Sequence, residues 1–139
     1  MPVIRKQIYA MTLGSQVQTT LIDATTYYFG KISNGMVTAT AYQDQLIPRT
    51  GIIVACTIST YSDTAGSAEA WAMYLRNDTK ATETLIESKT LNTNHREWKN
   101  YNLNIPVSAG DNIFFKTTTP TWVTNPDMTW AYATVLISY

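Results

Sequence analysis

The sequence has few of the residues that most enzyme sites require. Its 139 residues include one cysteine and one histidine, so it can form no internal disulfide and offers little for a metal site or a proton shuttle. Charged residues make up only 14%, below the roughly 25% of an ordinary soluble domain. The ten basic and ten acidic residues cancel, and a neutral chain has no net field that would attract nucleic acid or an anionic membrane. We therefore expect no cofactor, no nucleic-acid partner and no catalytic role.

Long apolar runs are also missing. Arg5 and Lys6 precede a short apolar stretch that Gln7, Thr12 and Gln16 interrupt, whereas a secretory signal needs about 7–15 continuous apolar residues. No run approaches the roughly 20 residues of a membrane span. We expect a chain that is neither secreted nor inserted into a membrane.

What the sequence has instead is typical of strands and turns. Hydrophobic residues reach 45% and aromatic residues 12%, and most of the remainder is threonine, serine and asparagine. Three segments alternate with a period of two, as strands with one buried face do. The expected buried faces are Ile52, Val54, Cys56 and Ile58 in 51–61, then Trp71, Met73 and Leu75 in 71–76, then Tyr101, Leu103 and Ile105 in 97–105.

Turn chemistry separates these segments. Asn34-Gly35 predicts a hairpin between strands 25–33 and 36–42, and residues 62–69 and 117–127 are expected to be loops. Gly110, in the segment 106–111, can adopt a positive φ. The last run, 129–139, is apolar on both faces, which predicts burial on both sides. About eight to ten short strands at this spacing are typical of a β-sandwich or barrel.

A family resemblance follows from the order of these segments. GIIVACTIST, WAMYLRND, YNLNIPVSAGDNIFFKTT, PTWVTNP and TWAYATVLI succeed one another in a way that resembles a tumour-necrosis-factor/C1q-like jelly roll. The sequence is most similar to the small trimeric jelly-roll domains of tailed bacteriophages, which occur on capsid decorations, head spikes and fibre tips. The resemblance covers about residues 36–139 and consists of a strand rhythm. It implies an all-β, single jelly-roll-like sandwich that forms a homotrimer.

The residues that could carry chemistry have simpler explanations. His95 lies between polar residues and is expected in an exposed loop, while Cys56 lies in an apolar strand and is expected in the core. The ten carboxylates show no motif for a hydrolytic pair. Asp63 and Asp78 could offer oxygens to Ca²⁺, but no segment has the regular acidic spacing of a calcium loop. We assign no catalytic, cofactor or metal-binding residue.

Aromatic residues are the most informative feature. Trp122 lies between Pro120 and Pro126 on an expected loop, and two explanations remain open. It could form a stacking platform or a partner anchor, together with Tyr61 and Asp63. Alternatively, the loop could fold its tryptophan back over the open end of the sandwich.

The last strand suggests a subunit contact. Trp130, Tyr132 and Leu136 would form its second apolar face. The resemblance implies that such residues pack around the threefold axis of a trimer, so we assign them to a subunit interface.

These expectations combine into one function. We expect a virion structural protein at the particle surface, synthesised in the host cytoplasm, which decorates or projects from a capsid and contacts capsid or tail proteins. Residues 1–139 form one domain, with 1–14 as a contact arm and 17–33 as the first strands of the sandwich.

One alternative is the tip of a tail fibre that recognises a host polysaccharide. The chain begins at Met1 without a repetitive shaft, which favours a separate decoration or spike protein. The other is a carbohydrate-binding module, which would show aromatic residues along one exposed sheet face.

Overall fold

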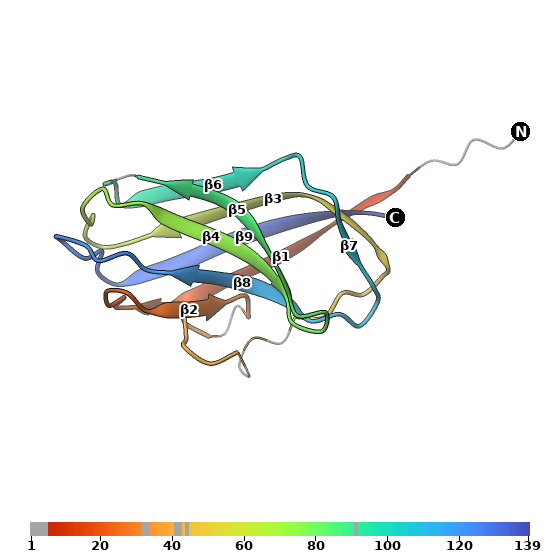
Figure 1. The fold of residues 1–139 in the computed structure, drawn as a ribbon, viewed down its shortest axis with the longest axis horizontal. Helices are drawn as coiled ribbons and strands as arrows, with labels where there is room; N and C mark the ends of the chain where they lie inside the picture. Colours follow the sequence, from red (N-terminus) through yellow and green to blue (C-terminus); the bar gives the residue numbers. More distant parts are fainter. Residues whose placement is uncertain (1–5, 32–33, 41–42, 44, 91) are drawn as a thin grey trace, which may run out of the picture.

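The computed structural model describes residues 6–31, 34–40, 43, 45–90 and 92–139. Within these ranges the chain contains no α-helix, and so no helix that could span a membrane. It forms two antiparallel sheets packed face to face, a jelly-roll-like sandwich (Figure 1). The strands of the described part are β1 (Ile8–Thr19), β2 (Thr26–Phe29), β3 (Gly51–Tyr61), β4 (Trp71–Asn77), β5 (Thr82–Lys89), β6 (His95–Asn100), β7 (Ile105–Val107), β8 (Ile113–Thr118) and β9 (Thr129–Ser138).

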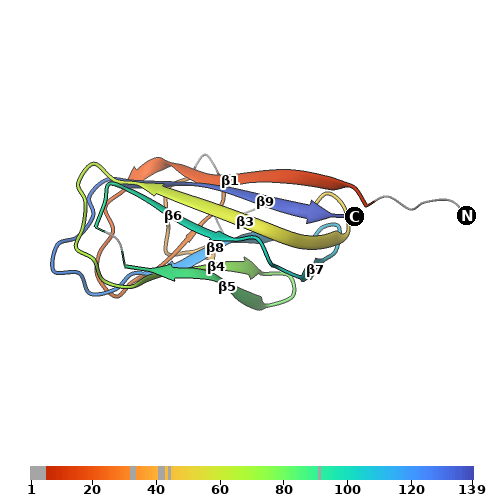
Figure 2. The same cartoon turned by 90° about the horizontal axis from the view of Figure 1, so that it is seen from above.

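Strands distant in sequence are neighbours in both sheets. The five-stranded sheet has the order β1-β9-β3-β6, with β7 also paired to β3, and the four-stranded sheet has the order β2-β8-β4-β5. Seen from above, the two sheets form separate layers with the core between them (Figure 2). β9 is therefore a central strand, with β1 on one side and β3 on the other. Below, the outer face of the five-stranded sheet means the side turned away from the four-stranded sheet.

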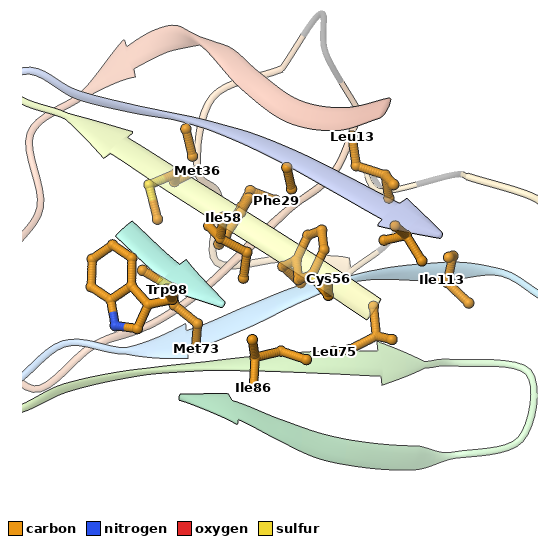
Figure 3. Close-up of a cluster of buried hydrophobic side chains, with 14 of the residues drawn as sticks. Leu13, Phe29, Met36, Cys56, Ile58, Met73, Leu75, Ile86, Trp98 and Ile113 are labelled. Carbon is orange, nitrogen blue, oxygen red and sulfur yellow. The ribbon is translucent and has the colours of Figure 1, made fainter. Parts of the chain in front are cut away.

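The core is built from the buried positions of alternating strands. In β4, Trp71, Met73 and Leu75 face inward and the residues between them are partly exposed, as predicted. Figure 3 shows Met73 and Leu75 meeting side chains of the facing sheet, among them Ile58 and Trp98. Each fully buried large apolar side chain contributes roughly 1.5–3 kcal/mol to folding relative to an exposed one.

A bulge in β3 changes the predicted faces of that strand. Its pairing with β9 shifts register between Ile53 and Ala55. As a result Ile53 is buried and Val54 only partly so, the reverse of the sequence prediction, whereas Cys56 and Ile58 point inward as predicted. A bulge inserts one extra residue and so reverses the alternation on one side of it.

Two further predictions about strands were wrong. Residues 97–105 do not form one strand, because β6 ends at Asn100 and β7 begins at Ile105; Tyr101 between them is 66% exposed. The buried residues of β6 are Arg96 and Trp98. The predicted strand 36–42 contributes only an isolated bridge between Val37 and Tyr28, and residues 41 and 42 lie outside the described ranges.

The N-terminal segment belongs largely to the sandwich. β1 pairs with β9 from Ile8 onward, so residues 8–14 are an integral strand and not the separate contact arm expected for 1–14. Residues 1–5 lie outside the described ranges. β2 pairs with β8, so the segment 17–33 supplies the second strand, whereas the first strand already begins at Ile8. Gly110 has a φ of 88°, as its turn was predicted to allow.

Candidate functional site

Four aromatic rings gather at one end of the outer face of the five-stranded sheet. Tyr61 stacks on His95 with ring centroids 4.4 Å apart and planes at 5°. On its other side it stacks on Trp130, at 4.6 Å and 20°. Trp130 in turn meets Tyr132 edge to face at 5.3 Å. We call His95, Tyr61, Trp130 and Tyr132 the outer aromatic cluster.

Strand register brings these rings together. Tyr61 is the last residue of β3, and it lies directly opposite His95 of β6 and Trp130 of β9. Directly opposed residues of antiparallel strands have side chains on the same face, about 5 Å apart. Tyr132 follows two residues after Trp130 on β9 and therefore points the same way.

The stack determines which parts of the rings can meet a partner. Both faces of the Tyr61 ring are covered, one by His95 and the other by Trp130. The three rings therefore stand side by side across the strands and turn their edges outward. Ring edges carry the positive part of the aromatic quadrupole, whereas flat stacking on a ligand needs a free face.

A shallow hollow of about 210 Å³ lies beside the cluster on the same outer face. Its lining includes the polar side chains of Thr57, Ser59, Glu97 and Lys99. Glu97 also lies 3.6 Å from His95 Nε2. Hydrogen-bonding groups of both charge signs thus border the aromatic rings.

The structure joins two sets of residues that the sequence analysis kept apart. Tyr61 was predicted as a ligand contact, and its ring lies against Trp130. Trp130 in turn contacts Tyr132, and both Trp130 and Tyr132 were predicted in a subunit interface. Asp63 lies two residues beyond Tyr61, where its carboxylate accepts a hydrogen bond from Gln18 Nε2 at 3.2 Å. Leu136 lies farther along β9 on the same face and is partly exposed.

Trp122 does not belong to this surface. It is only 4% exposed, and its ring packs edge to face on Trp71 at 5.4 Å. Of the two explanations left open by the sequence, the structure shows the loop folded back over the end of the sandwich. A buried ring offers no exposed platform for a ligand, so the assignment of Trp122 as a contact residue is corrected.

Two other side chains clarify the local chemistry. Cys56 is buried as predicted, and burial raises the pKa of its thiol to about 12, so the thiol is protonated and unreactive at neutral pH. His95 is exposed as predicted, but it begins β6 and does not lie in a loop. Among the described residues, no three His, Cys, Asp or Glu side chains gather as a metal site requires.

A buried arginine, Arg96, was not among the predicted site residues. Arg96 is 4% exposed and points between the sheets, where its guanidinium lies 5.4 Å from the Trp71 ring centroid. Burial lowers the pKa of Arg96, while the nearby charge of Glu69 acts in the opposite direction. The signal was present in the sequence, because Arg96 is two residues from Trp98 and shares its face.

Glu69 lies in the loop at this end of the sandwich. Its carboxylate accepts hydrogen bonds from the Ser67 hydroxyl and, at 3.0 Å, from the Val123 backbone N–H. These bonds, that of Ser67 first, lower the pKa of Glu69. The loops that contain Ser67 and Thr124 are also joined by a backbone hydrogen bond of 2.8 Å.

Comparisons with known proteins give similarities of fold only. No protein-family model matches the sequence, and no curated protein matches it either. Among solved structures, the chain is similar to a chain of infectious bursal disease virus, Gx strain, at 12% identity and a TM-score of 0.36. That match covers 97% of this chain and 32% of the viral chain, so this chain spans about a third of its length. A mutant of a family 29 carbohydrate-binding module is similar at 5% identity and a TM-score of 0.40, over 95% of this chain and 93% of the module.

Proposed function

We propose that this chain is a non-catalytic structural protein of a virion surface, a capsid decoration or head-spike protein that acts through contacts between subunits. The observation that carries the proposal is the outer aromatic cluster, which lies on a partly exposed sheet face. Tyrosine and tryptophan are enriched in the energetically dominant centres of protein interfaces. A sheet face with such a group is therefore a natural contact surface.

The geometry of the cluster favours a protein partner. Stacked rings are already ordered, so their burial costs little side-chain entropy. Because both faces of the Tyr61 ring are covered, the stack suits packing by the side chains of a partner protein better than stacking on a planar ligand. Apolar side chains extend the surface beyond the cluster: Leu136 is partly exposed and Ile8 is 60% exposed on the neighbouring strand.

The biological setting comes from the resemblance of residues 36–139 to jelly-roll domains of tailed bacteriophages. It supports a homotrimer whose subunits meet through Trp130, Tyr132 and Leu136. It also supports a location at the particle surface, with capsid or tail proteins as further partners. The proposal assigns no catalytic step to the chain.

Light scattering of the purified chain on a sizing column tests the subunit contact. We expect a mass near three times 15.6 kDa. Tyr132→Ala should shift the mass toward that of a single chain, because truncation of a hot-spot tyrosine weakens an interface at least tenfold. Tyr101→Ala is the matched control, since Tyr101 is exposed but lies outside the cluster.

Two results would contradict this function. One is a single-chain mass at every concentration. The other is a trimer that Tyr132→Ala leaves intact while circular dichroism shows the variant folded. Either result would show that the outer aromatic cluster does not mediate trimer formation.

Carbohydrate binding is a second candidate, favoured by a different observation. Aromatic residues from three strands share one sheet face, and the adjoining hollow offers Ser59, Glu97 and Lys99 to hydroxyl groups. A glycan array with the wild-type chain tests this candidate. Binding that Tyr132→Ala weakens about tenfold would support host attachment through this face, provided that Leu85→Ala, an exposed position on β5 of the other sheet, leaves binding unchanged. An array without binding would exclude the glycans tested.

A further inference from the structure

The buried side of β6 carries an arginine with two donor atoms that have no hydrogen-bond partner. Arg96 lies directly opposite Thr60 of β3, and both side chains point between the sheets. The Nε and Nη2 atoms of Arg96 are buried and have no hydrogen-bond partner. A guanidinium remains charged at neutral pH, and an unpaired buried charge carries a large free-energy penalty.

The two unpaired nitrogens form one edge of the guanidinium. Nε–H and the Nη2–H on the same side point in parallel, at the spacing of the two oxygens of a carboxylate. This edge is the part of arginine that binds a carboxylate through two hydrogen bonds. The arrangement therefore indicates the shape of the missing partner as well as its negative charge.

Two more polar side chains at this end of the sandwich are also unpaired. The Thr60 hydroxyl and the Trp122 Nε1–H are buried without a hydrogen-bond partner. Trp122 and Arg96 both contact the ring of Trp71. Thr60 lies opposite Arg96 on the neighbouring strand, so these unpaired groups favour an occupant that accepts hydrogen bonds.

Glu69 does not fill this role. It is the carboxylate whose charge acts on Arg96, but its oxygens bind the Ser67 hydroxyl and the Val123 N–H. These bonds hold together the loops that close this end of the sandwich, in which a hydrogen bond also joins Ser67 and Thr124. A ligand would enter when the two loops separate.

We propose that this end of the sandwich is a binding site for a carboxylate, held by the Nε and Nη2 edge of Arg96 with Thr60 and Trp122 as further donors. The carboxylate can belong to a small organic acid or to an acidic sugar, and both sources present the same group to Arg96. The site is independent of the outer aromatic cluster, because Arg96 lies on the opposite face of the sheet from His95 and Tyr61.

The direct test uses the wild-type chain and its arginine side-chain signals. Sodium formate is titrated against sodium chloride at constant ionic strength, and the Nε–H resonances are followed by NMR. The resonance of Arg96 should shift and saturate with formate but not with chloride. Arg76 is an internal control, because its Nε–H already binds Asp78 at 2.8 Å. A parallel titration with glucuronate, and one with glucose, tests whether an acidic sugar can enter.

A stability measurement provides the second readout. Formate at about a hundredfold excess over its Kd should raise the Tm of the wild-type chain by roughly 5–10 °C. Arg96→Met should abolish this rise, and Arg96→Lys should reduce it, because lysine keeps the charge but loses the two-pronged edge. The proposal is overturned if the Arg96 resonance does not respond to formate or if Arg96→Met retains the full rise in Tm.

Discussion

Trp71, which packs against Trp98 and Trp122 at one end of the sandwich, makes a hydrogen bond whose contribution to stability can be measured. The indole N–H of Trp71 donates to the hydroxyl of Thr117 at 2.6 Å, and that hydroxyl donates to the carbonyl of Ala72 at 2.6 Å. Trp71 and Thr117 are almost completely buried. Thr117→Val removes the hydroxyl with little change in shape, whereas Trp71→Phe removes the donor and part of the ring.

The structure gives the expected losses in the free energy of unfolding. Thr117→Val leaves a buried indole N–H without a partner, which costs about 1–3 kcal/mol in the free energy of unfolding. Trp71→Phe loses the same bond and also leaves a cavity beside Trp98 and Trp122, so we expect about 2–4 kcal/mol. The free energy of unfolding of the double variant should fall by about 1–2 kcal/mol less than the sum of the two single losses, because the double variant has no buried donor without a partner.

Urea unfolding followed by circular dichroism measures all four proteins of this cycle. The slope of the free energy with urea should stay constant, so that the midpoints report stability. In thermal scans, Thr117→Val alone should lower the Tm by about 4–12 °C. A Thr117→Val change below about 0.5 kcal/mol, or strictly additive losses in the double variant, would refute the assigned hydrogen bond.

Three further predictions concern backbone fit, pH and thiol access. Gly14→Ala should destabilise the fold by more than about 2 kcal/mol, because the added carbon would lie 2.6 Å from the carbonyl oxygen of Ala131. Gly110→Ala should cost only about 1–2 kcal/mol, for the left-handed backbone, since nothing lies within 4 Å of the added carbon. Equal losses of the two variants in urea unfolding would contradict this contrast. The pKa of Asp111 is lowered, first by the backbone N–H of Ser108, so the carboxylate stabilises the fold above the unfolded pKa of about 3.9 and this contribution is lost as the pH falls further. Asp111→Ala should therefore be less stable at pH 7 and show a flatter acid limb, and a parallel loss at every pH would refute the charge effect. Cys56, with a thiol pKa of about 12, should react with a thiol reagent at pH 8 only as fast as the chain opens; rapid labelling of the native protein would contradict its burial.

Local patterns predicted the sandwich well where one rule governs a segment. The alternation of Trp71, Met73 and Leu75 was confirmed because a strand with one buried face repeats every two residues. The same rule failed within β3, since the bulge at Ile53–Ala55 interrupts the repeat and leaves no signal in residue type. It failed again for 97–105, where apolar Tyr101 is exposed.

The candidate sites were harder to predict because they combine distant strands. Tyr61, His95 and Trp130 are separated by more than thirty residues each in the sequence, and only the pairing of β3 with β6 and β9 places their rings in contact. The burial of Trp122 likewise depends on a distant residue, because its ring packs against Trp71 of β4.

Composition and two-residue alternation are local properties of the chain, and they were enough to predict a neutral, strand-rich protein with one histidine and one cysteine. Glycine, proline and asparagine likewise predicted the segments that turn. Which strands lie side by side became known from the three-dimensional structure, and this pairing brings aromatic rings together on the outer face and encloses Arg96 between the sheets. Pairing between distant strands depends on the packing of the whole core, and no local pattern specifies it.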